Sequence, residues 1–324
     1  FFIMQNVVVT FDTDKEQRQV VESLIKKSDI KYLKDYDEHQ YGDVLKNADA
    51  LLSWNPSREF KSHSITLNNK IKFVQLLSAG SDHINLKMFP AGCKVAANNG
   101  AYSEPMAEHI MAMVLALAKR LFINHQHLAD GEFNQKGINI SIKNSVFGIL
   151  GYGGIGKALA NLIRPFGSKI LAINFSGRTT DTVDFIGTLN NLNHVLKNSN
   201  IIIISLPLSD ETEGLISKNE LSLMRPDAIL INAARGKIIN EADLYEHLRT
   251  HSDFYAGIDA WWSEPFTEGE FKLNYPFFEL PNIIGSPHNS AVVPGSLLEG
   301  IKSAIENLNR FLNNNEPENI INKI

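Results

Sequence analysis

Three features are scarce in this sequence of 324 residues, and each scarcity excludes a class of protein. Cys93 is the single cysteine, so no disulfide can form within the chain, and a reducing compartment, the cytoplasm, is expected. No uninterrupted apolar run approaches the about 20 residues that span a bilayer, which argues against a membrane protein. Lysine and arginine number 31 against 36 aspartate and glutamate residues, and the resulting net charge of -5 argues against nucleic-acid binding.

What the sequence does contain is a repeated alternation of strand and helix patterns. Hydrophobic residues make up 44% of the chain, and its length favours two domains. Apolar or β-branched runs predict buried strands at 6–11, 48–54, 71–80, 145–150, 200–208, 228–236, 255–262 and 282–288. Helical spacing of apolar residues, as at 15–27 and 294–315, separates them. The alternation predicts an α/β fold with doubly wound parallel sheets.

The longest helical pattern runs from 103 to 131. Its segment 110–118 is wholly apolar, so that part is expected to be buried on all sides, and the helix is expected to link two domains. Ser103 suits the N-cap. The helix also carries His109, His125 and His127. The last two are spaced two residues apart and face different sides, so no metal site is predicted, and all three histidines are expected to be structural or solvated.

The segment GYGGIG (151–156) follows the apolar run SVFGIL and precedes the helical pattern KALANLI. Strand, glycine-rich turn and helix in this order are typical of a site for the pyrophosphate of a dinucleotide. Gly151 would permit the tight turn, Gly153 the close approach of the pyrophosphate, and Gly156 the packing of helix against strand. Gly154 and Ile155 would lie at the start of the helix, whose free N–H groups attract phosphate.

The end of the next strand predicts the phosphorylated form of the cofactor. Dinucleotide folds usually place Asp or Glu here, where the carboxylate accepts hydrogen bonds from ribose hydroxyls. In ILAINFSGR (170–178) the position holds Asn174, followed by Ser176 and Arg178. An amide, a hydroxyl and a cation suit a 2′-phosphate, which a carboxylate would repel. The sequence therefore favours NADP, with NAD as the alternative if Asn174 contacts the ribose hydroxyls.

Three later strands are each followed by polar residues that suit one reaction. Arg235 lies in INAARG, Glu264 in GIDAWWSEP, and His288 in SPHNSA. Because ligands of open parallel sheets bind beyond the carboxyl ends of the strands, these side chains are expected to converge. Arg235 could hold a carboxylate by a two-pronged contact, and His288 could give a proton to a developing alkoxide while Glu264 orients the imidazole. Together with a dinucleotide, this set suits hydride transfer to a 2-keto acid.

These motifs resemble those of the D-isomer-specific 2-hydroxyacid dehydrogenases, and the resemblance covers nearly the whole chain. It rests on LLSAGSDHI (76–84), VAANNGAYSEPMAEH (95–109), GILGYGGIGKALA (148–160), SLPLSDET (205–212), INAARG (231–236), GIDAWWSEP (257–265) and SPHNSA (286–291). It implies an oxidoreductase acting on a small 2-keto or D-2-hydroxy acid, of the glyoxylate/hydroxypyruvate reductase or glycerate dehydrogenase type. It also implies a Rossmann-type cofactor domain (101–290) inserted into a flavodoxin-like substrate domain (1–100 and 291–324), an active site between them, and homodimers that pair through the cofactor domains.

The resemblance also assigns roles to residues. Arg235 would bind the substrate, His288 would be the acid/base, and Glu264 would be the partner of His288. Asp259 would contact the nicotinamide carboxamide. The backbone N–H groups of Ser78, Ala79 and Gly80 would hold the substrate carboxylate. Further cofactor contacts would come from Leu206, Pro207, Thr212, Ala233 and Ala234.

Some positions depart from the family pattern and leave the substrate open. Ala233 replaces a commoner threonine or serine, DAWW is bulkier than the usual apolar pair, and Asn289 replaces an apolar residue or glycine. Trp54, in the loop that follows LLSW, favours a small or partly apolar substrate. Arg58 in the same loop keeps a phosphorylated substrate such as 3-phosphoglycerate open.

Two other kinds of protein share this fold. A non-catalytic dinucleotide sensor or corepressor is one alternative, and the intact set of Arg235, Glu264 and His288 weighs against it. A formate dehydrogenase is another. That relative carries glutamine beside its histidine, whereas this sequence has Glu264.

Overall fold

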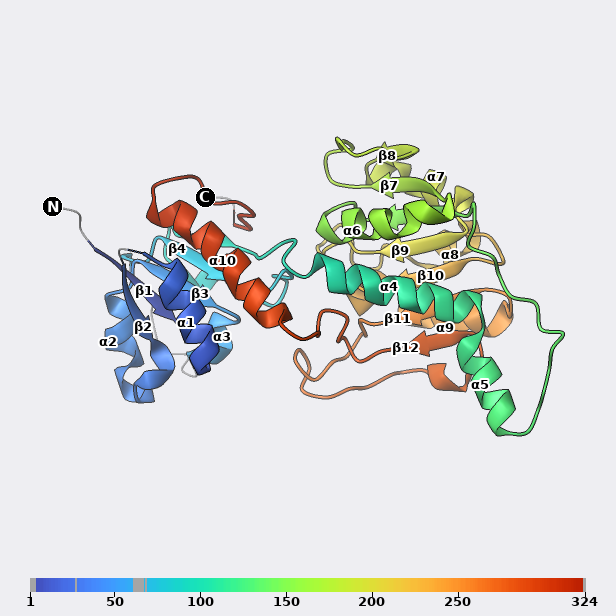
Figure 1. Cartoon of the computed structure of the whole chain (residues 1–324), viewed down its shortest axis with the longest axis horizontal. Helices are drawn as coiled ribbons and strands as arrows, with labels where there is room; N and C mark the ends of the chain where they lie inside the picture. Colours follow the sequence, from blue (N-terminus) through green and yellow to red (C-terminus); the bar gives the residue numbers. More distant parts are fainter. Residues whose placement is uncertain (1–3, 27, 61–66, 68, 323–324) are drawn as a thin grey trace. The chain divides into compact units, whose positions relative to one another are not determined.

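The computed structural model describes residues 4–26, 28–60, 67 and 69–322, which belong to two compact units (Figure 1). Unit 1 combines the segments Phe1–Tyr102 and Val293–Ile324, and unit 2 is the continuous segment Ser103–Val292. Lys27, the last residue of the helix expected at 15–27, lies outside the described residues.

Unit 1 is built on a parallel sheet with the strand order β2-β1-β3-β4-β5. This is the flavodoxin-like order. The strands are β1 Gln5–Val9, β2 Ser28–Tyr32, β3 Ala50–Ser53, β4 Phe73–Leu76 and β5 Lys94–Ala96. The helices are α1 Lys15–Leu24, α2 Tyr41–Lys46, α3 Pro56–Glu59 and α10 Ser296–Leu312, with short 3₁₀ turns at Leu33–Asp35, Glu38–Gln40 and Leu86–Met88.

The two faces of this sheet carry separate apolar cores because strand side chains alternate in direction. Val7 and Val9 of β1 pack in one cluster with Val21 of α1 and Ile305 of α10. Val8 packs in the other, with residues of α2. The chain therefore returns after unit 2 to complete a core that its first strand begins.

Unit 2 contains a seven-stranded parallel sheet with the order β12-β11-β10-β9-β6-β7-β8. Counted from β6, its first six strands follow the order 3-2-1-4-5-6 of the Rossmann fold, with β12 added at the edge. The strands are β6 Val146–Leu150, β7 Lys169–Ile173, β8 Phe185–Gly187, β9 Ile201–Ile204, β10 Ile229–Asn232, β11 Tyr255–Ile258 and β12 Ile283–Gly285. The helices are α4 Ser103–Ala118, α5 Leu121–Ala129, α6 Gly154–Ile163, α7 Leu192–Asn198, α8 Lys218–Leu223 and α9 Glu241–Thr250, with 3₁₀ turns at Arg164–Phe166, Leu189–Asn191, Gly236–Ile238 and Phe277–Glu279.

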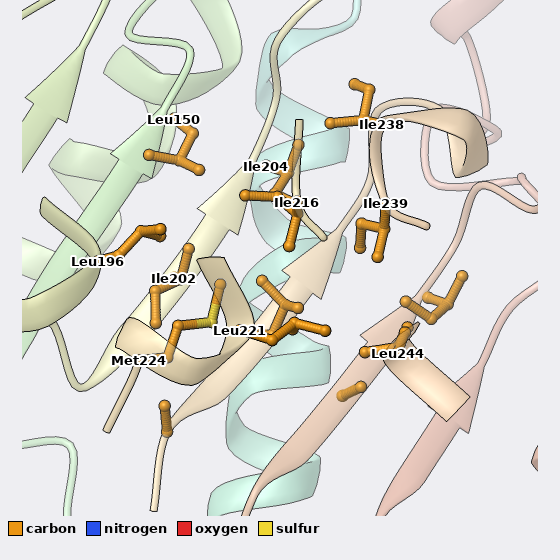
Figure 2. Packing of buried hydrophobic residues seen from close by; sticks show 14 of the residues in the cluster. Leu150, Leu196, Ile202, Ile204, Ile216, Leu221, Met224, Ile238, Ile239 and Leu244 are labelled. Carbon is orange, nitrogen blue, oxygen red and sulfur yellow. The ribbon is translucent and has the colours of Figure 1, made fainter. Parts of the chain in front are cut away.

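Helices cover both faces of the seven-stranded sheet. The four isoleucines of β9 are all buried; Ile202 and Ile204 point into the cluster that contains α7, α8 and α9 residues, as Figure 2 shows. Ile201 and Ile203 point into the cluster formed with α4 and α6. An uninterrupted apolar run is therefore required at β9, as the sequence indicates. The prediction of two doubly wound parallel-sheet α/β domains is confirmed.

The single helix expected at 103–131 is wrong, because the chain breaks between α4 and α5. Arg120 adopts a left-handed conformation with φ of 52°. The carbonyl of Ala118 accepts the N–H of Ile140 at 2.8 Å, and Lys119 Nζ donates to the carbonyl of Ile140 at 2.8 Å. The carbonyl of Ala118, which would accept the next N–H of a continuing helix, is therefore bonded to a distant segment. No glycine or proline in the sequence signals that α4 ends here.

Two further expectations for this region also fail. Ala112 is exposed, so the segment 110–118 is not buried on all sides. Ser103 is the first residue of α4, and its hydroxyl is buried without a hydrogen-bond partner, so it does not cap the helix. Across the part of the chain that the structure describes, no helix has both the length and the apolar character needed to cross a membrane.

A histidine pair lies where α9 ends. The rings of His247 and His251 stack with centroids 4.1 Å apart, and Phe254 meets the His247 ring edge to face. Nε2 of His247 is buried without a hydrogen-bond partner. Burial, and secondarily the charge of His251, lowers the pKa of His247 from 6.5 to about 4.

This pair should make the stability of the protein fall in mild acid. The unfolded chain binds a proton at His247 near pH 6.5 and the folded chain only near pH 4, so the free energy of unfolding should fall as pH drops through that window. The loss should be at most about 2–3 kcal/mol, since the ring is partly exposed. Urea unfolding at pH 7.5, 5.5 and 4.5 would measure it. His247→Phe should flatten the dependence and His39→Gln, at an exposed position, should not; equal slopes in all three proteins would contradict the assignment.

Candidate active site

The glycine-rich turn connects β6 to α6. Gly151 has φ of 110°, and a Cβ there would lie 2.5 Å from the carbonyl carbon of Ser205, so position 151 tolerates no side chain. A Cβ at Gly156 would lie 2.7 Å from the Gly151 carbonyl oxygen, because the helix packs closely on the turn. A Cβ at Gly153 would meet no atom within 4 Å. Open space therefore lies beside Gly153, where α6 begins with Gly154 and Ile155, and it fits an anion bound to the helix N–H groups.

The loop after β7 is closed by its own hydrogen bonds. Asn174 Nδ2 donates to the carbonyl of Arg178 at 2.8 Å, and Ser176 Oγ donates to Asn174 Oδ1 at 3.3 Å. The N–H of Arg178 donates to Ser176 Oγ at 3.3 Å. The Asn174 amide, expected to donate to a phosphate, thus uses one of its N–H groups inside the loop. The Arg178 side chain is exposed, and within the described part of the chain it forms no ion pair.

Two neighbours shape this loop further. Phe175 is 99% exposed between Asn174 and Ser176. Asp181, the nearest acidic residue that follows, forms an ion pair with Lys157 of α6 at 3.3 Å and is not merely solvated. The negative charge closest to Arg178 along the chain is therefore offset by a lysine.

The loops after β9 and β10 place the other expected cofactor residues at the same edge of the sheet. Thr212 is buried, and its hydroxyl donates to the carbonyl of Pro207 at 2.7 Å while accepting the N–H of Ser209 at 2.8 Å. Its described contacts therefore hold the loop that contains Leu206 and Pro207 in shape. Ala233 and Ala234 are buried directly after β10.

Asp259, directly after β11, is a fully buried carboxylate with one unsatisfied oxygen. Its Oδ1 accepts the hydroxyl of Ser286 at 2.6 Å and the N–H of Asn289 at 3.3 Å. Its Oδ2 is buried and has no hydrogen-bond partner. A buried carboxylate oxygen without a donor is costly, so this position fits a ligand that brings an N–H or O–H group.

His109 reaches the same carboxylate from α4. Its Nε2 lies 2.8 Å from Ser286 Oγ and 3.7 Å from Asp259 Oδ1. From the sequence, His109 is expected to be structural or solvated, like His125 and His127. The structure places His109 beside Asp259 and the other two histidines on α5. The only signal in the sequence was its position near the start of α4, which does not reveal a partner 177 residues later.

His288 and Glu264 form the most direct pair in the site. Nδ1 of His288 lies 2.8 Å and 3.0 Å from the two carboxylate oxygens of Glu264, which is 5% exposed. Glu264 also accepts the backbone N–H of Trp261 at 2.6 Å. His288 has φ of 51°, a strained conformation for a residue with a side chain. Since Nδ1 faces Glu264, Nε2 is the ring nitrogen that can face a substrate.

Arg235 follows β10 and is half-buried. Its backbone carbonyl accepts Asn232 Nδ2 at 2.9 Å, and its Nη1 donates to the carbonyl of Ala234 at 2.8 Å. A Cβ on the following Gly236 would lie 2.2 Å from the carbonyl carbon of Trp261. The backbone that follows Arg235 is thus in close contact with the segment between Asp259 and Glu264.

In unit 1, Ser78, Ala79 and Gly80 form the loop that follows β4. Among the described residues, none of their three backbone N–H groups donates a hydrogen bond. The carbonyl of Leu77, just before them, accepts the hydroxyl of Tyr102 at 3.0 Å. Consecutive N–H groups without acceptors are suited to a carboxylate.

Trp54 belongs to a loop held by the half-buried carboxylate of Glu59, a residue that the sequence does not single out. Glu59 Oε1 accepts the backbone N–H groups of Trp54 and Asn55 at 2.9 and 3.0 Å. Glu59 Oε2 accepts the hydroxyls of Thr10 and Ser53. The Trp54 ring stacks with Tyr102 at 6.5 Å between centroids. Arg58 is exposed on the outside of the same short helix.

Comparisons with known proteins identify the family of this chain. The sequence model of the D-isomer specific 2-hydroxyacid dehydrogenase NAD-binding domain matches residues 111–290. The chain belongs to this family. An NAD-binding domain of this family therefore spans the glycine-rich turn, Asp259 and the His288–Glu264 pair.

Several relatives in this family match along most of both chains. A glyoxylate reductase of Aeropyrum pernix is 27% identical over 317 residues, 94% of this chain and 93% of its own. The structure of a glycerate dehydrogenase related protein from Thermoplasma acidophilum is 28% identical, covers 95% of this chain and 99% of its own, and has a TM-score of 0.62. An acyclic imino acid reductase, solved in complex with NADPH and D-arginine, shares the fold with a TM-score of 0.76 at 21% identity, over 98% of this chain and 100% of its own.

Two glycines of the turn should respond differently to the same added methyl group. Gly153→Ala should change the free energy of unfolding by less than about 0.5 kcal/mol, because its Cβ enters open space, but weaken dinucleotide binding roughly tenfold or more. Gly156→Ala should destabilise the fold by about 1–3 kcal/mol, since its Cβ would press on the Gly151 carbonyl. Thermal unfolding and fluorescence titration with the cofactor would separate these effects. Unimpaired binding in Gly153→Ala would place the pyrophosphate elsewhere.

Proposed function

We propose that this protein reduces a small 2-keto acid to a D-2-hydroxy acid with a reduced nicotinamide dinucleotide. The observation that carries the proposal is the His288–Glu264 pair, in which a carboxylate fixes one imidazole nitrogen at the carboxyl edge of a dinucleotide-binding sheet. The cofactor, when bound, supplies a hydride.

His288 acts as the proton donor in this proposal. The hydride adds to the keto carbon, and the oxygen, which gains negative charge, takes the proton from Nε2 of His288. The product is the hydroxy acid and His288 is left neutral. Glu264 accepts a hydrogen bond from Nδ1, which fixes the ring orientation and stabilises the imidazolium before transfer.

The substrate carboxylate is the second group that must be held. Arg235 can bind it through two parallel N–H groups, and its planar guanidinium is suited to this contact. The N–H groups of Ser78, Ala79 and Gly80 are further proposed carboxylate contacts. Trp54 lies on a loop fixed by Glu59 and favours a small or partly apolar substituent on the keto acid.

Glyoxylate and hydroxypyruvate are the substrates we propose, since relatives named glyoxylate reductase match over most of the chain. A 3-phosphoglycerate dehydrogenase is the alternative that Arg58 would support. A non-catalytic dinucleotide sensor predicts cofactor binding without turnover.

We propose NADP as the preferred cofactor. The loop 174–178 offers no carboxylate to the ribose, and the ion pair of Asp181 with Lys157 offsets the nearest acid. Arg178 supplies the cation for a 2′-phosphate, while Asn174 and Ser176 shape the loop that presents it.

We also propose a homodimer formed through unit 2. Large apolar side chains are exposed on α5 and just after it, and patches of this kind mark association surfaces. They are Leu121, Phe122, Leu128, Phe133 and Ile138. α5 has no buried residue within the chain, so a second copy is the occupant we assign to it.

We propose a cytoplasmic location, which suits the single cysteine. Burial raises the pKa of its thiol to about 11.

The catalytic proposal predicts turnover that depends on His288. Oxidation of NADPH with glyoxylate, hydroxypyruvate, pyruvate and 3-phosphohydroxypyruvate should show the first two as the best substrates. His288→Ala should lower kcat about 100- to 10,000-fold, because a general acid is lost, while the Kd of the cofactor stays within about threefold. Absence of turnover on every keto acid, with cofactor binding intact, would favour the sensor. Full activity of His288→Ala would remove this residue from the mechanism.

The cofactor proposal predicts a preference that Arg178 controls. kcat/KM should be higher with NADPH than with NADH, and Arg178→Ala should reduce the ratio by about 1.5–3 kcal/mol, the range for a charged hydrogen bond. Arg225→Ala is the control, since Arg225 is exposed and pairs with Asp227 at 3.1 Å. A native preference for NADH would overturn the assignment.

A further inference from the structure

The chain His109–Ser286–Asp259 carries an inference that rests on the proposed dinucleotide-dependent function and goes beyond it. The three residues come from α4, from the loop after β12 and from the loop after β11, so three separate segments of unit 2 converge on one carboxylate. We propose that His109 is a positioning residue for the cofactor, which acts through Ser286 to make Asp259 an obligatory hydrogen-bond acceptor for the carboxamide N–H of the nicotinamide.

The direction of the hydrogen bonds follows from the number of protons available. An ionised Asp259 can only accept, and Ser286 has a single hydroxyl proton. The 2.6 Å contact of Ser286 Oγ with Asp259 Oδ1 uses that proton. Ser286 Oγ must then accept at its 2.8 Å contact with His109, so Nε2 of His109 carries a hydrogen and donates. The chain therefore donates toward Asp259 at every step.

Since every hydrogen bond of the chain points toward Asp259, its Oδ2 atom remains as an acceptor for a donor from a ligand. Oδ1 already accepts from Ser286 and from the N–H of Asn289, whereas Oδ2 is buried without a donor. An amide N–H satisfies such an oxygen and an amide carbonyl would be repelled by it. Asp259 thus selects the nitrogen end of a carboxamide, and that choice orients the carboxamide group at the site.

His109 lies where it can fix the direction of the Ser286 hydroxyl. Ser286 is held on both sides, since its N–H donates to Ile258 and its carbonyl accepts Trp261 Nε1 at 2.8 Å. Rotation of the Ser286 hydroxyl is the freedom that remains. The hydrogen bond that His109 donates to its oxygen keeps the hydroxyl proton directed toward Asp259. His109 Nε2, 3.7 Å from Oδ1, also offers the carboxylate a favourable dipole or charge.

The experiment compares two cofactors that differ in one group. The 3-acetylpyridine analogue of the preferred dinucleotide carries a methyl ketone in place of the carboxamide and therefore lacks the N–H. Kd values of both would be measured by calorimetry for the native enzyme and for His109→Leu, His109→Gln and Ser286→Ala. His125→Leu, on α5, is the control.

We expect His109→Leu and Ser286→Ala to bind the carboxamide cofactor about tenfold more weakly and the analogue within about twofold of the native Kd. His109→Gln retains an N–H donor at a similar reach and should bind the carboxamide cofactor within about threefold of native. The control should match the native enzyme with both cofactors. Thermal unfolding identifies a variant that has lost its fold, in which case Ser286→Ala, which removes one oxygen atom, decides the outcome.

Two results would overturn the proposal. Native affinity for both cofactors in His109→Leu and Ser286→Ala would show that the chain does not act on the carboxamide. Equal weakening with both cofactors would show that His109 supports the local fold around Asp259 instead. A native enzyme that binds neither cofactor would refute the proposed function itself, so the two failures are distinguishable.

Discussion

The turn that carries His288 depends on Asp259. The backbone carbonyl of Asp259 accepts the N–H of His288 at 3.0 Å, and its carboxylate accepts the N–H of Asn289 and the hydroxyl of Ser286. These bonds hold His288 at a positive φ, a conformation that costs a residue with a side chain about 1–3 kcal/mol. One buried aspartate therefore supports the backbone of the proposed acid, and its second oxygen, which has no donor in the described structure, is the atom that we propose accepts a hydrogen bond from the cofactor. Changes at Asp259 would affect both. His109, which contacts Ser286 Oγ and forms none of these bonds, gives a more selective probe.

A second constraint is the parallel direction of all seven strands in unit 2. Their carboxyl ends share one edge, so residues from the loops after β6, β10, β11 and β12 gather there although they are far apart in the sequence. This is why the sequence predicts one site for Arg235, Glu264 and His288: each follows a buried apolar run, and the ends of parallel strands lie at one edge of the sheet. Of the three, His288 and Glu264 are in direct contact. The fold class was predictable for the same reason, because continuous runs such as Ile201–Ile204 suit strands covered on both faces.

The features that the sequence did not reveal arise from partners that are distant along the chain. The end of α4 depends on Ile140, which supplies an N–H to Ala118, and no local residue type signals that contact. The role of His109 depends on Ser286, and a lone histidine on an apolar helix gives no indication of its partner. Glu59 looks like an exposed helix residue in the sequence, yet it binds two hydroxyls and two backbone N–H groups. Periodicity describes which face is buried; it does not describe which polar groups meet.

The loop after β7 shows how a structure can redistribute a role that the sequence assigns to several residues. The sequence suggested that Asn174, Ser176 and Arg178 would each contact a phosphate. In the folded loop the first two bond to each other and to the backbone of Arg178. Their contribution is then to hold the loop in one conformation, which lowers the entropic cost of binding an anion. The cation alone supplies the charge, and its discrimination between the two cofactors should weaken as ionic strength rises, because Arg178 is exposed and its field is screened within about 8–10 Å at physiological salt.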